Sequence, residues 1–468
     1  MRIGSRYRRA LIALGALAGG CWMALPAQAV PSYARQTGFS CAQCHTIYPE
    51  LTPLGRRFKL TGYLLTTTPS QGTEKEEYVL NRTPPISAMV QISATQTQKD
   101  LPDSNATPDG GKSQNGTVAF PQQLSLFYAG RVSANTGAFI QLTYSGPDDA
   151  FSMDNADIRV VGEGGLGGAQ FVYGLTLNNN PGVQDLWNST PAFGYPYAGS
   201  ATAPAPGAAI QLDGSLGQQV AGIGAYAAWL MSHSFLYAEL SVYRSAQLGV
   251  AQPLDSSAPN PVLRDTAPYL RAAYEINWST ASLEVGAIGM NATLLPTNVQ
   301  QDSTCDPAAA TCPLKALNQV QPNRYYDSGI DFQFDYIPSN ENIFTFKGLW
   351  LHEDQSLGTD SGAEHSANRL DTSRITGSYY RNREAGIIAQ WFSTTGSKDA
   401  GLYSGNRINV PDSSGYIVEL VYIPALNVRY SLQYTMYEMF DGAATNYDRS
   451  GRNASDNNTV YLLAWLMF

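Results

Sequence analysis

Side chains that bind metal ions through nitrogen or sulfur are scarce in this chain of 468 residues, which has four histidines, five cysteines and nine methionines. Charged residues are also few, at 14% of the total, and the net charge is −9. The chain therefore lacks the basic surface with which proteins bind nucleic acid, and we expect no nucleic-acid partner.

Long apolar runs are missing as well. Near the start, four arginines precede a short apolar stretch over 10–25, and Ala27-Gln28-Ala29 has the small side chains at which signal peptidase cleaves. We predict that 1–29 is an export signal, with lipid attachment at Cys21 as a weaker alternative. No later stretch of about 18 apolar residues exists, which excludes further membrane-spanning helices.

Apolar and polar side chains alternate in segments of about ten residues from residue 86 onward. This period indicates strands with one polar face, as in a membrane barrel or, less specifically, a soluble β-sandwich. In a barrel the apolar residues of 428–436 and 330–336 would face lipid. The polar residues expected to face the lumen are Arg429, Ser431, Gln433 and Thr435 in the first segment and Asp331, Gln333 and Asp335 in the second.

Sixteen such segments can be counted, and the links between them alternate between long and short. Outer-membrane barrels have short periplasmic turns and long external loops. We therefore predict a mostly β protein, in which 85–468 forms an antiparallel outer-membrane β-barrel of about 16 strands in contact with lipid. The expected strands are 86–97, 121–132, 138–145, 156–163, 169–179, 219–230, 235–244, 267–278, 281–291, 324–336, 342–353, 368–380, 384–395, 415–423, 428–440 and 458–468.

One pair of cysteines belongs to the motif Cys41-Ala42-Gln43-Cys44-His45. In an exported chain this pattern indicates covalent haem attachment, in which both thiols bond to the haem and the histidine is the proximal ligand of the iron. A thiol-redox pair is the competing interpretation, but it does not require the histidine. We predict a monohaem cytochrome c head over 30–84, with Cys41, Cys44 and His45 holding one haem c.

The second pair, Cys305 and Cys312, brackets a short loop rich in Asp, Pro and Ala. In an oxidising compartment such a pair is expected to form a disulfide. A metal site is the less favoured alternative, because no histidine lies near it.

The distal ligand of the haem iron is not evident. From residue 30 to residue 88 there is no methionine, and His45 is the only histidine. The sixth position is therefore empty, filled by an unusual group, or filled from outside the head, where Met89 is the nearest candidate. The other histidines, for which we expect solvated roles, are His233, His352 and His365.

Five segments carry a resemblance to a known family. They are Pro31-Ser32-Tyr33-Ala34-Arg35-Gln36-Thr37-Gly38 before the motif, Pro49-Glu50-Leu51, Gly55-Arg56-Arg57-Phe58-Lys59-Leu60 and Gly62-Tyr63 after it, and Trp187-Asn188-Ser189-Thr190-Pro191-Ala192-Phe193-Gly194-Tyr195-Pro196-Tyr197 in an expected external loop. These residues resemble the fused outer-membrane monohaem cytochrome c–porins of iron-oxidising bacteria. The resemblance implies an oxidoreductase that removes one electron from extracellular Fe(II) and passes it to a periplasmic cytochrome c or cupredoxin.

The head is expected inside the barrel, because one haem hanging free in the periplasm cannot span an apolar band of about 25 Å. Four basic residues of the head would then pair with haem propionates or lumen acids, or stay solvated. The basic residues are Arg35, Arg56, Arg57 and Lys59, and the acids include Glu239, Glu275, Glu284 and Asp331.

Two other functions remain open on the sequence. The chain is either a porin whose haem head is a plug or a redox sensor, or a conduit that carries electrons outward to an extracellular acceptor. Acidic residues near the external loops are expected to attract Fe²⁺, although acidic loops are also ordinary solvated surface. They are Asp148, Asp149, Asp154, Glu353, Asp354 and Glu364.

Overall fold

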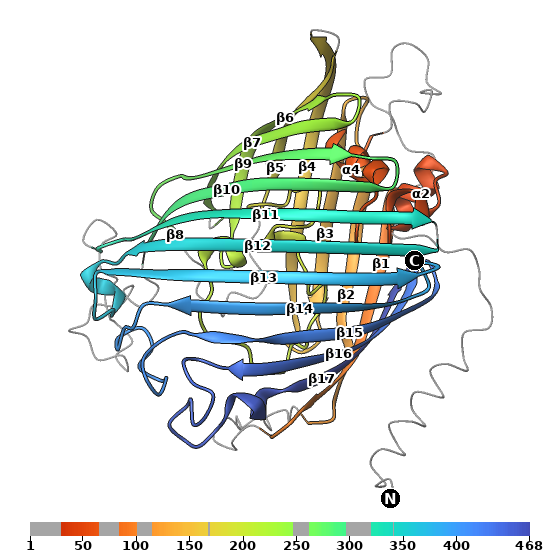
Figure 1. The fold of residues 1–468 in the computed structure, drawn as a ribbon. Coiled ribbons are helices and arrows are strands. Elements are labelled where there is room, and N and C mark those ends of the chain that lie inside the picture. The colour runs from red at the N-terminus through yellow and green to blue at the C-terminus, as the bar shows by residue number, and fades with distance from the viewer. Residues whose placement is uncertain are drawn as a thin grey trace, which may run out of the picture.

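A computed structural model of the chain describes residues 30–64, 84–100, 115–166, 169–246, 262–295, 320–339 and 341–468. The predicted export signal (1–29) and the predicted disulfide partners Cys305 and Cys312 lie outside these residues. The described strands form one closed antiparallel sheet (Figure 1). Closure is achieved because β1 (Ile86–Thr97) pairs with both β2 (Thr117–Arg131) and the last strand, β17 (Thr459–Met467).

The described part of the chain contains sixteen long strands, which confirms the predicted barrel. An additional two-residue strand, β8 (Val262–Leu263), pairs with the end of β10. The remaining bounds are β3 (Thr136–Ser145), β4 (Ala150–Leu166), β5 (Ala169–Asn178), β6 (Val220–Leu230), β7 (Ser234–Ser245), β9 (Ala267–Asn277), β10 (Ala281–Leu295), β11 (Asn323–Ser339), β12 (Asn342–Ser356), β13 (Ala367–Arg381), β14 (Ala385–Gly396), β15 (Ser413–Ala425) and β16 (Val428–Met439).

The predicted alternation of links fails at one place. We expected a strand from residue 156, but β4 begins at Ala150, so that only residues 146–149 join it to β3 on the side of the long loops. The longer strand is stabilised because the side chains of Thr143 and Gln141 on β3 donate to the Asp154 carboxylate, over 2.5 and 3.0 Å.

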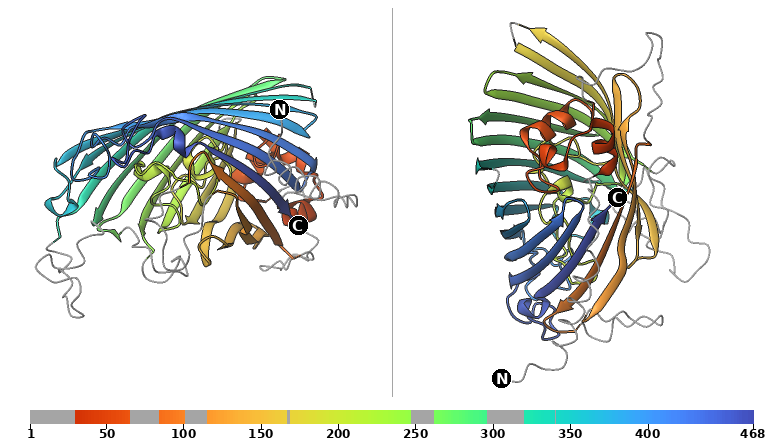
Figure 2. Two further views of the ribbon diagram at one scale, coloured as in Figure 1. Left: turned by 90° about the horizontal axis from the view of Figure 1, so that it is seen from below. Right: turned by 90° about the vertical axis from the view of Figure 1, so that its right-hand side faces the viewer.

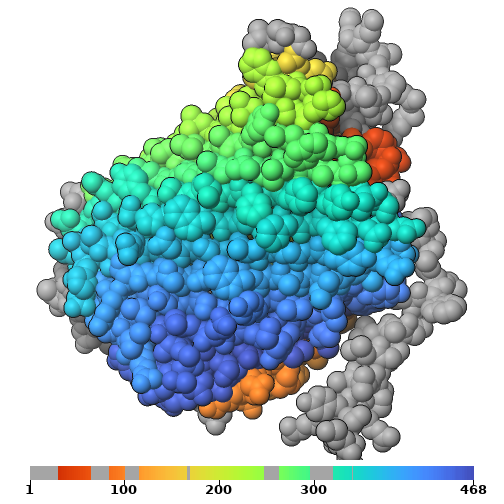
Figure 3. Space-filling model, in the orientation of Figure 1, coloured from red at the N-terminus to blue at the C-terminus, as the bar shows by residue number. Residues whose placement is uncertain are grey.

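The two faces of the wall differ as the sequence predicted. Ile330 and Leu432 are 57% and 42% exposed on the outer face, whereas Asp331 and Gln333 are each 2% exposed on the inner face. Further large apolar side chains are exposed along the outer wall, part of which Figure 3 shows over β10–β17. A closed sheet with an apolar outer surface satisfies its backbone hydrogen bonds in lipid, so we describe the chain as a membrane-spanning barrel.

The head consists of three short helices at the end of the barrel where the strands are joined by short turns. They are α2 (Pro31–Thr37), α3 (Cys41–Cys44) and α4 (Pro53–Leu60). Figure 2 shows them within the mouth of the barrel, at the end where the C-terminus lies. No described helix is both long and apolar enough to cross a bilayer. The predicted position of the head inside the lumen agrees with this arrangement.

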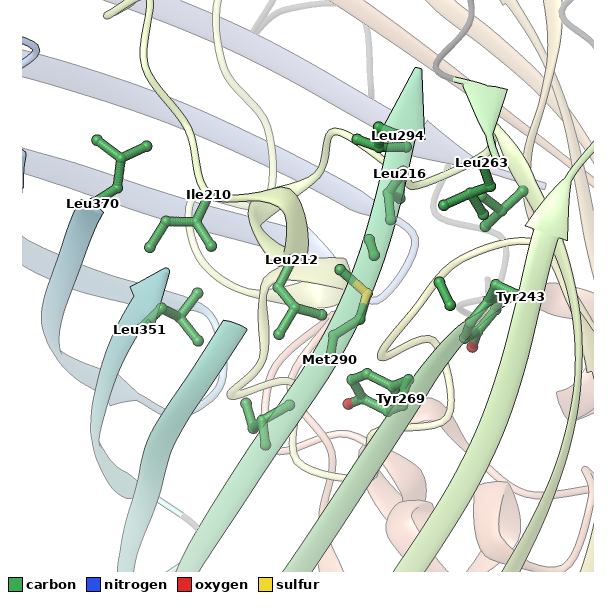
Figure 4. Close-up of a cluster of buried hydrophobic side chains, with 14 of the residues drawn as sticks. Ile210, Leu212, Leu216, Tyr243, Leu263, Tyr269, Met290, Leu294, Leu351 and Leu370 are labelled. Carbon is green, nitrogen blue, oxygen red and sulfur yellow. The ribbon is translucent and has the colours of Figure 1, made fainter. Parts of the chain in front are cut away.

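The long link between β5 and β6, residues 179–219, folds into the lumen. Its 3₁₀ helix η3 (Gln211–Asp213) lies against the inner wall, where Ile210 and Leu212 join a buried apolar cluster with Met290 and Leu351 (Figure 4). We expected Trp187–Tyr197 in an external loop, but Trp187 is 1% exposed. Because this link carries many apolar side chains, burial in the lumen is favoured over exposure to water.

Candidate haem-binding site

The cysteines and the histidine of the motif lie on and just after α3. Ser40 and Gln43 form a capping box at the start of this helix, and the i, i+3 spacing places Cys41 and Cys44 on one face. Both are thiols, and the two are not joined by a disulfide. Burial, and then the neighbouring Cys41, raise the pKa of the Cys44 thiol to about 11. A thiol-redox centre needs a thiolate, so this environment does not favour that alternative.

His45 is held in the tautomer that a haem ligand requires. Its Nδ1 lies 3.1 Å from the carbonyl oxygen of Glu50, which can only accept, so Nδ1 donates and Nε2 keeps its lone pair. Burial lowers the pKa of His45 to about 4, although the backbone contacts with Glu50 and Pro49 oppose this shift. The imidazole is therefore neutral and able to bind iron.

A cavity of about 930 Å³, part of it open to solvent, adjoins all three motif side chains. Its lining is largely apolar and aromatic. The residues are Val30, Tyr33, Ala34, Thr37, Phe39, Ser40, Cys41, Cys44, His45, Tyr48, Pro49, Leu51, Gly55, Phe58, Lys59, Tyr63, Phe139, Asn188 and Phe193. Two thiols and a neutral imidazole around an apolar cavity fit a covalently bound haem.

Gly55 permits α4 to pack against the motif. A Cβ atom at this position would lie 2.0 Å from the carbonyl oxygen of Cys44, which is far inside contact distance. The N-cap Thr52 also joins the two segments, because its Oγ1 accepts from Gly55 N and donates to the carbonyl oxygen of Gln43.

Arg56 on α4 connects the head to the barrel wall. Its guanidinium is 3.0 Å from Glu275 on β9 and 3.1 Å from Asp335 on β11, and all three side chains are at most 5% exposed. Sequence reasoning named Glu275 among the possible partners, and the structure contains that pair. Asp335 was placed in the lumen but not matched with Arg56.

The other basic residues of the head have different partners. Arg35 donates to the carbonyl oxygen of Ile86 at 2.5 Å, and Arg57 lies 3.4 Å from the side-chain oxygen of Gln170. Deeper in the lumen, the acids pair with residues of the wall itself. Arg271 pairs with Asp185, Glu284 and Asp331, and Glu239 accepts from Tyr237.

The link between β5 and β6 completes the cavity. Asn188 and Phe193 belong to this link and line the cavity, and Asn188 also donates to the carbonyl oxygen of Pro49. Tyr197 donates to Glu50 over 2.7 Å. The family resemblance singled out this segment without indicating that it touches the head, because an 11-residue segment far from the motif carries no signal of where it folds.

Two arginines of the wall bind the main chain around the motif, and sequence reasoning gave neither of them this role. Arg383, in the turn after β13, donates to the carbonyl oxygens of Ala42 and His45 at 2.5 and 3.0 Å. Arg429 donates to that of Tyr48 at 2.7 Å. A turn arginine looks like ordinary surface charge in the sequence, so nothing marked Arg383 in advance.

One sequence signal for the docking of the head was present in β17. Tyr461, Leu463 and Trp465 face inward, where other strands carry polar residues, and they belong to an apolar cluster that Tyr33 and Tyr48 of the head join. The ring of Tyr48 lies edge-on to Trp465 at 5.0 Å. An apolar inner face predicts a packed partner in the lumen.

Met89 is 3% exposed and faces the lumen in the same cluster, but it is not among the residues that line the cavity. The remaining histidines do not line it either. His233 lies in the turn after β6, His352 lies on β12 with its Nδ1 2.8 Å from Asp371, and His365 lies in the link after β12.

The acidic residues proposed to attract Fe²⁺ do not form one site. Glu353 is fully buried in the lumen, whereas the side chain of Asp354 is 72% exposed. Asp148 and Asp149 bind Ser145 and Tyr144 beside the β3–β4 turn. Within the described ranges, no three histidine, cysteine or acidic side chains are grouped so as to hold a metal ion directly.

No family model matches the chain, and no curated protein matches its sequence. Among solved structures, it is similar to the outer-membrane protein OmpT of Vibrio cholerae, with 9% identity and a TM-score of 0.42 over 82% of this chain and 97% of that one. The channel DcaP of Acinetobacter baumannii has 12% identity and a TM-score of 0.42, covering 82% and 96%. OmpF of Salmonella typhi, in complex with daunomycin, has 10% identity and a TM-score of 0.43, over 84% of this chain and 100% of that one. Likeness at this level carries no argument about what this barrel binds.

Proposed function

We propose that this chain is an outer-membrane cytochrome, in which a c-type haem carried by the head takes one electron from extracellular Fe²⁺ and delivers it to a periplasmic cytochrome c or cupredoxin. The observation that carries the proposal is the cavity inside the mouth of a membrane-spanning barrel, lined by Cys41, Cys44 and His45. A bound haem would supply the one-electron couple between ferric and ferrous iron.

The residues around the cavity have separate roles in this proposal. Cys41 and Cys44 would bind the group covalently, and His45 would bind its iron through Nε2 while the Glu50 carbonyl fixes the ring. Arg383 and Arg429 fix the backbone on either side of His45. The short-turn end of an outer-membrane barrel faces the periplasm, so a periplasmic acceptor would approach the cavity from that end.

The proposal is tested first on purified protein produced with haem attachment. Haem should stay on the chain through denaturing electrophoresis, and Cys41→Ala with Cys44→Ala should abolish haem staining, because thioether bonds survive unfolding. Stopped-flow mixing with Fe²⁺ should convert the ferric spectrum to the ferrous one, and His45→Ala should lose most of this reaction. Equal staining of the double variant, or a spectrum that excess Fe²⁺ leaves ferric, would contradict the proposal.

The reduction potential distinguishes oxidation of Fe²⁺ from the alternative of an outward electron conduit. A strongly positive potential suits oxidation of Fe²⁺, whereas a strongly negative one suits a conduit that reduces an extracellular acceptor. Redox titration of the purified protein therefore decides the direction of electron flow.

A further inference from the structure

Lys59 differs from every other residue that lines the haem cavity. Apart from His45, it is the only lining residue whose side chain carries an ionisable nitrogen, and it is 7% exposed. Its Nζ donates to the carbonyl oxygen of Asp185 at 2.5 Å and lies 4.4 Å from the centre of the Phe193 ring. Among the described residues, no carboxylate oxygen lies within 4.0 Å of Nζ. Within the described ranges, this buried amine therefore has no carboxylate as a direct partner.

Contacts with the barrel fix the position of Lys59. Its carbonyl oxygen accepts from Arg159 on β4 at 2.8 Å, while its side chain reaches the β5–β6 link at Asp185. The residue lies on α4, one turn after Gly55, where the helix packs against Cys44. Lys59 thus lines the cavity from the same helix that packs against the haem motif.

Three other cavity side chains with potential ligand atoms are already hydrogen-bonded. The hydroxyl of Tyr33 donates to the carbonyl oxygen of Ala138 at 3.2 Å, and that of Tyr63 donates to Asp157 at 2.6 Å. The side-chain amide of Asn188 donates to Pro49. Tyr48 packs edge-on to the His45 ring at 5.4 Å, beside the proximal ligand.

Protonation favours the amine over the phenols. Iron binds phenolate or neutral amine, not phenol or ammonium. Burial, and then Asp157, raise the pKa of Tyr33 and Tyr63, which keeps both as phenols. Burial, and then Arg159, lower the pKa of Lys59 to about 8, which brings the neutral amine within reach.

We propose that Nζ of Lys59 would be the second protein ligand of the haem iron, an inference that rests on the proposed haem site. The lone pair of the neutral amine would bind the iron, and the Asp185 carbonyl would accept one of its N–H groups. This would also explain how a head without methionine, and with one histidine, completes the coordination of its iron.

Absorption and electron paramagnetic resonance spectra of the ferric full-length protein test this ligand. We expect a low-spin, six-coordinate signal of the amine type for the native protein and for Met89→Leu. Lys59→Ala and Lys59→Arg should both lose the low-spin signal, because guanidinium stays protonated and does not bind iron. Lys59→Met should restore a low-spin signal with the thioether charge-transfer band. Heat-modified migration on gels would check that each barrel is folded.

Three results would overturn the inference. The first is a high-spin native protein, and the second is loss of the low-spin signal in Met89→Leu. The third is a low-spin Lys59→Arg protein, which would assign Lys59 a purely electrostatic role beside the propionates. Failure of the haem proposal itself is distinguishable, since the native protein would then carry no haem through denaturing electrophoresis.

Discussion

Single residues decide where the head lies in the barrel, and Arg56 of the head is the clearest case. Its guanidinium is buried against Glu275 and Asp335 and receives no compensation from water. Removing one member of a buried ionic group leaves the others uncompensated, at a cost of about 3–5 kcal/mol. The stability of docking therefore depends on this residue more than on any exposed contact of the head.

Arg56→Ala should weaken head docking while the barrel stays folded, because the strands pair without the head. We expect faster proteolysis of 30–64 and unchanged heat-modified migration of the barrel. Arg57→Ala is the matched control, since Arg57 is an exposed neighbour on the same helix. Equal cleavage rates in the two variants would show that the buried pairs do not hold the head.

Individual residues also show which parts of the site could be predicted from the sequence. The haem motif could be found because thioether chemistry fixes its spacing, and Asp331 and Arg429 could be placed in the lumen because strands alternate. The roles of Arg383 and Asn188 could not be predicted. Each contacts the head across more than a hundred positions of chain, and no local pattern encodes such a contact.

At the scale of elements, strands were predictable and the β5–β6 link was not. Strand bounds follow from an alternation that lipid and lumen impose together. The link folds inward through Asp185, whose carboxylate accepts from the backbone amides of Trp187, Ser189 and Thr190 and pairs with Arg271. These contacts depend on a wall that forms only when the barrel closes, so the link alone resembles an external loop.

Asp185→Ala should release this link from the lumen, because the amide turn loses its acceptor and Arg271 loses one partner. We expect an increased single-channel conductance in planar bilayers relative to the native protein. Asp354→Ala, at an exposed carboxylate, should leave conductance unchanged. Identical conductance of Asp185→Ala and native barrels would mean that the link does not restrict the lumen.

At the scale of the whole molecule, two segments that are far apart in the sequence, the head and the β5–β6 link, lie in the same lumen. They contact each other at the cavity. In this arrangement the head would hold the proposed haem covalently, while the barrel supplies part of the cavity wall, including Phe139. The arrangement also places the cavity at the short-turn end, so an electron from outside must enter through the filled lumen. Electron transfer would therefore have to occur without passage of the donor through the barrel.

The most direct test uses vesicles with the haem-loaded barrel inserted, a soluble cytochrome c and a coloured Fe²⁺ chelator enclosed, and Fe²⁺ supplied only outside. The account predicts reduction of the enclosed cytochrome c while the chelator stays colourless, and loss of this reduction in His45→Ala. An enclosed cytochrome c that stays oxidised, or that is reduced only as the chelator reports entry of Fe²⁺, would contradict it.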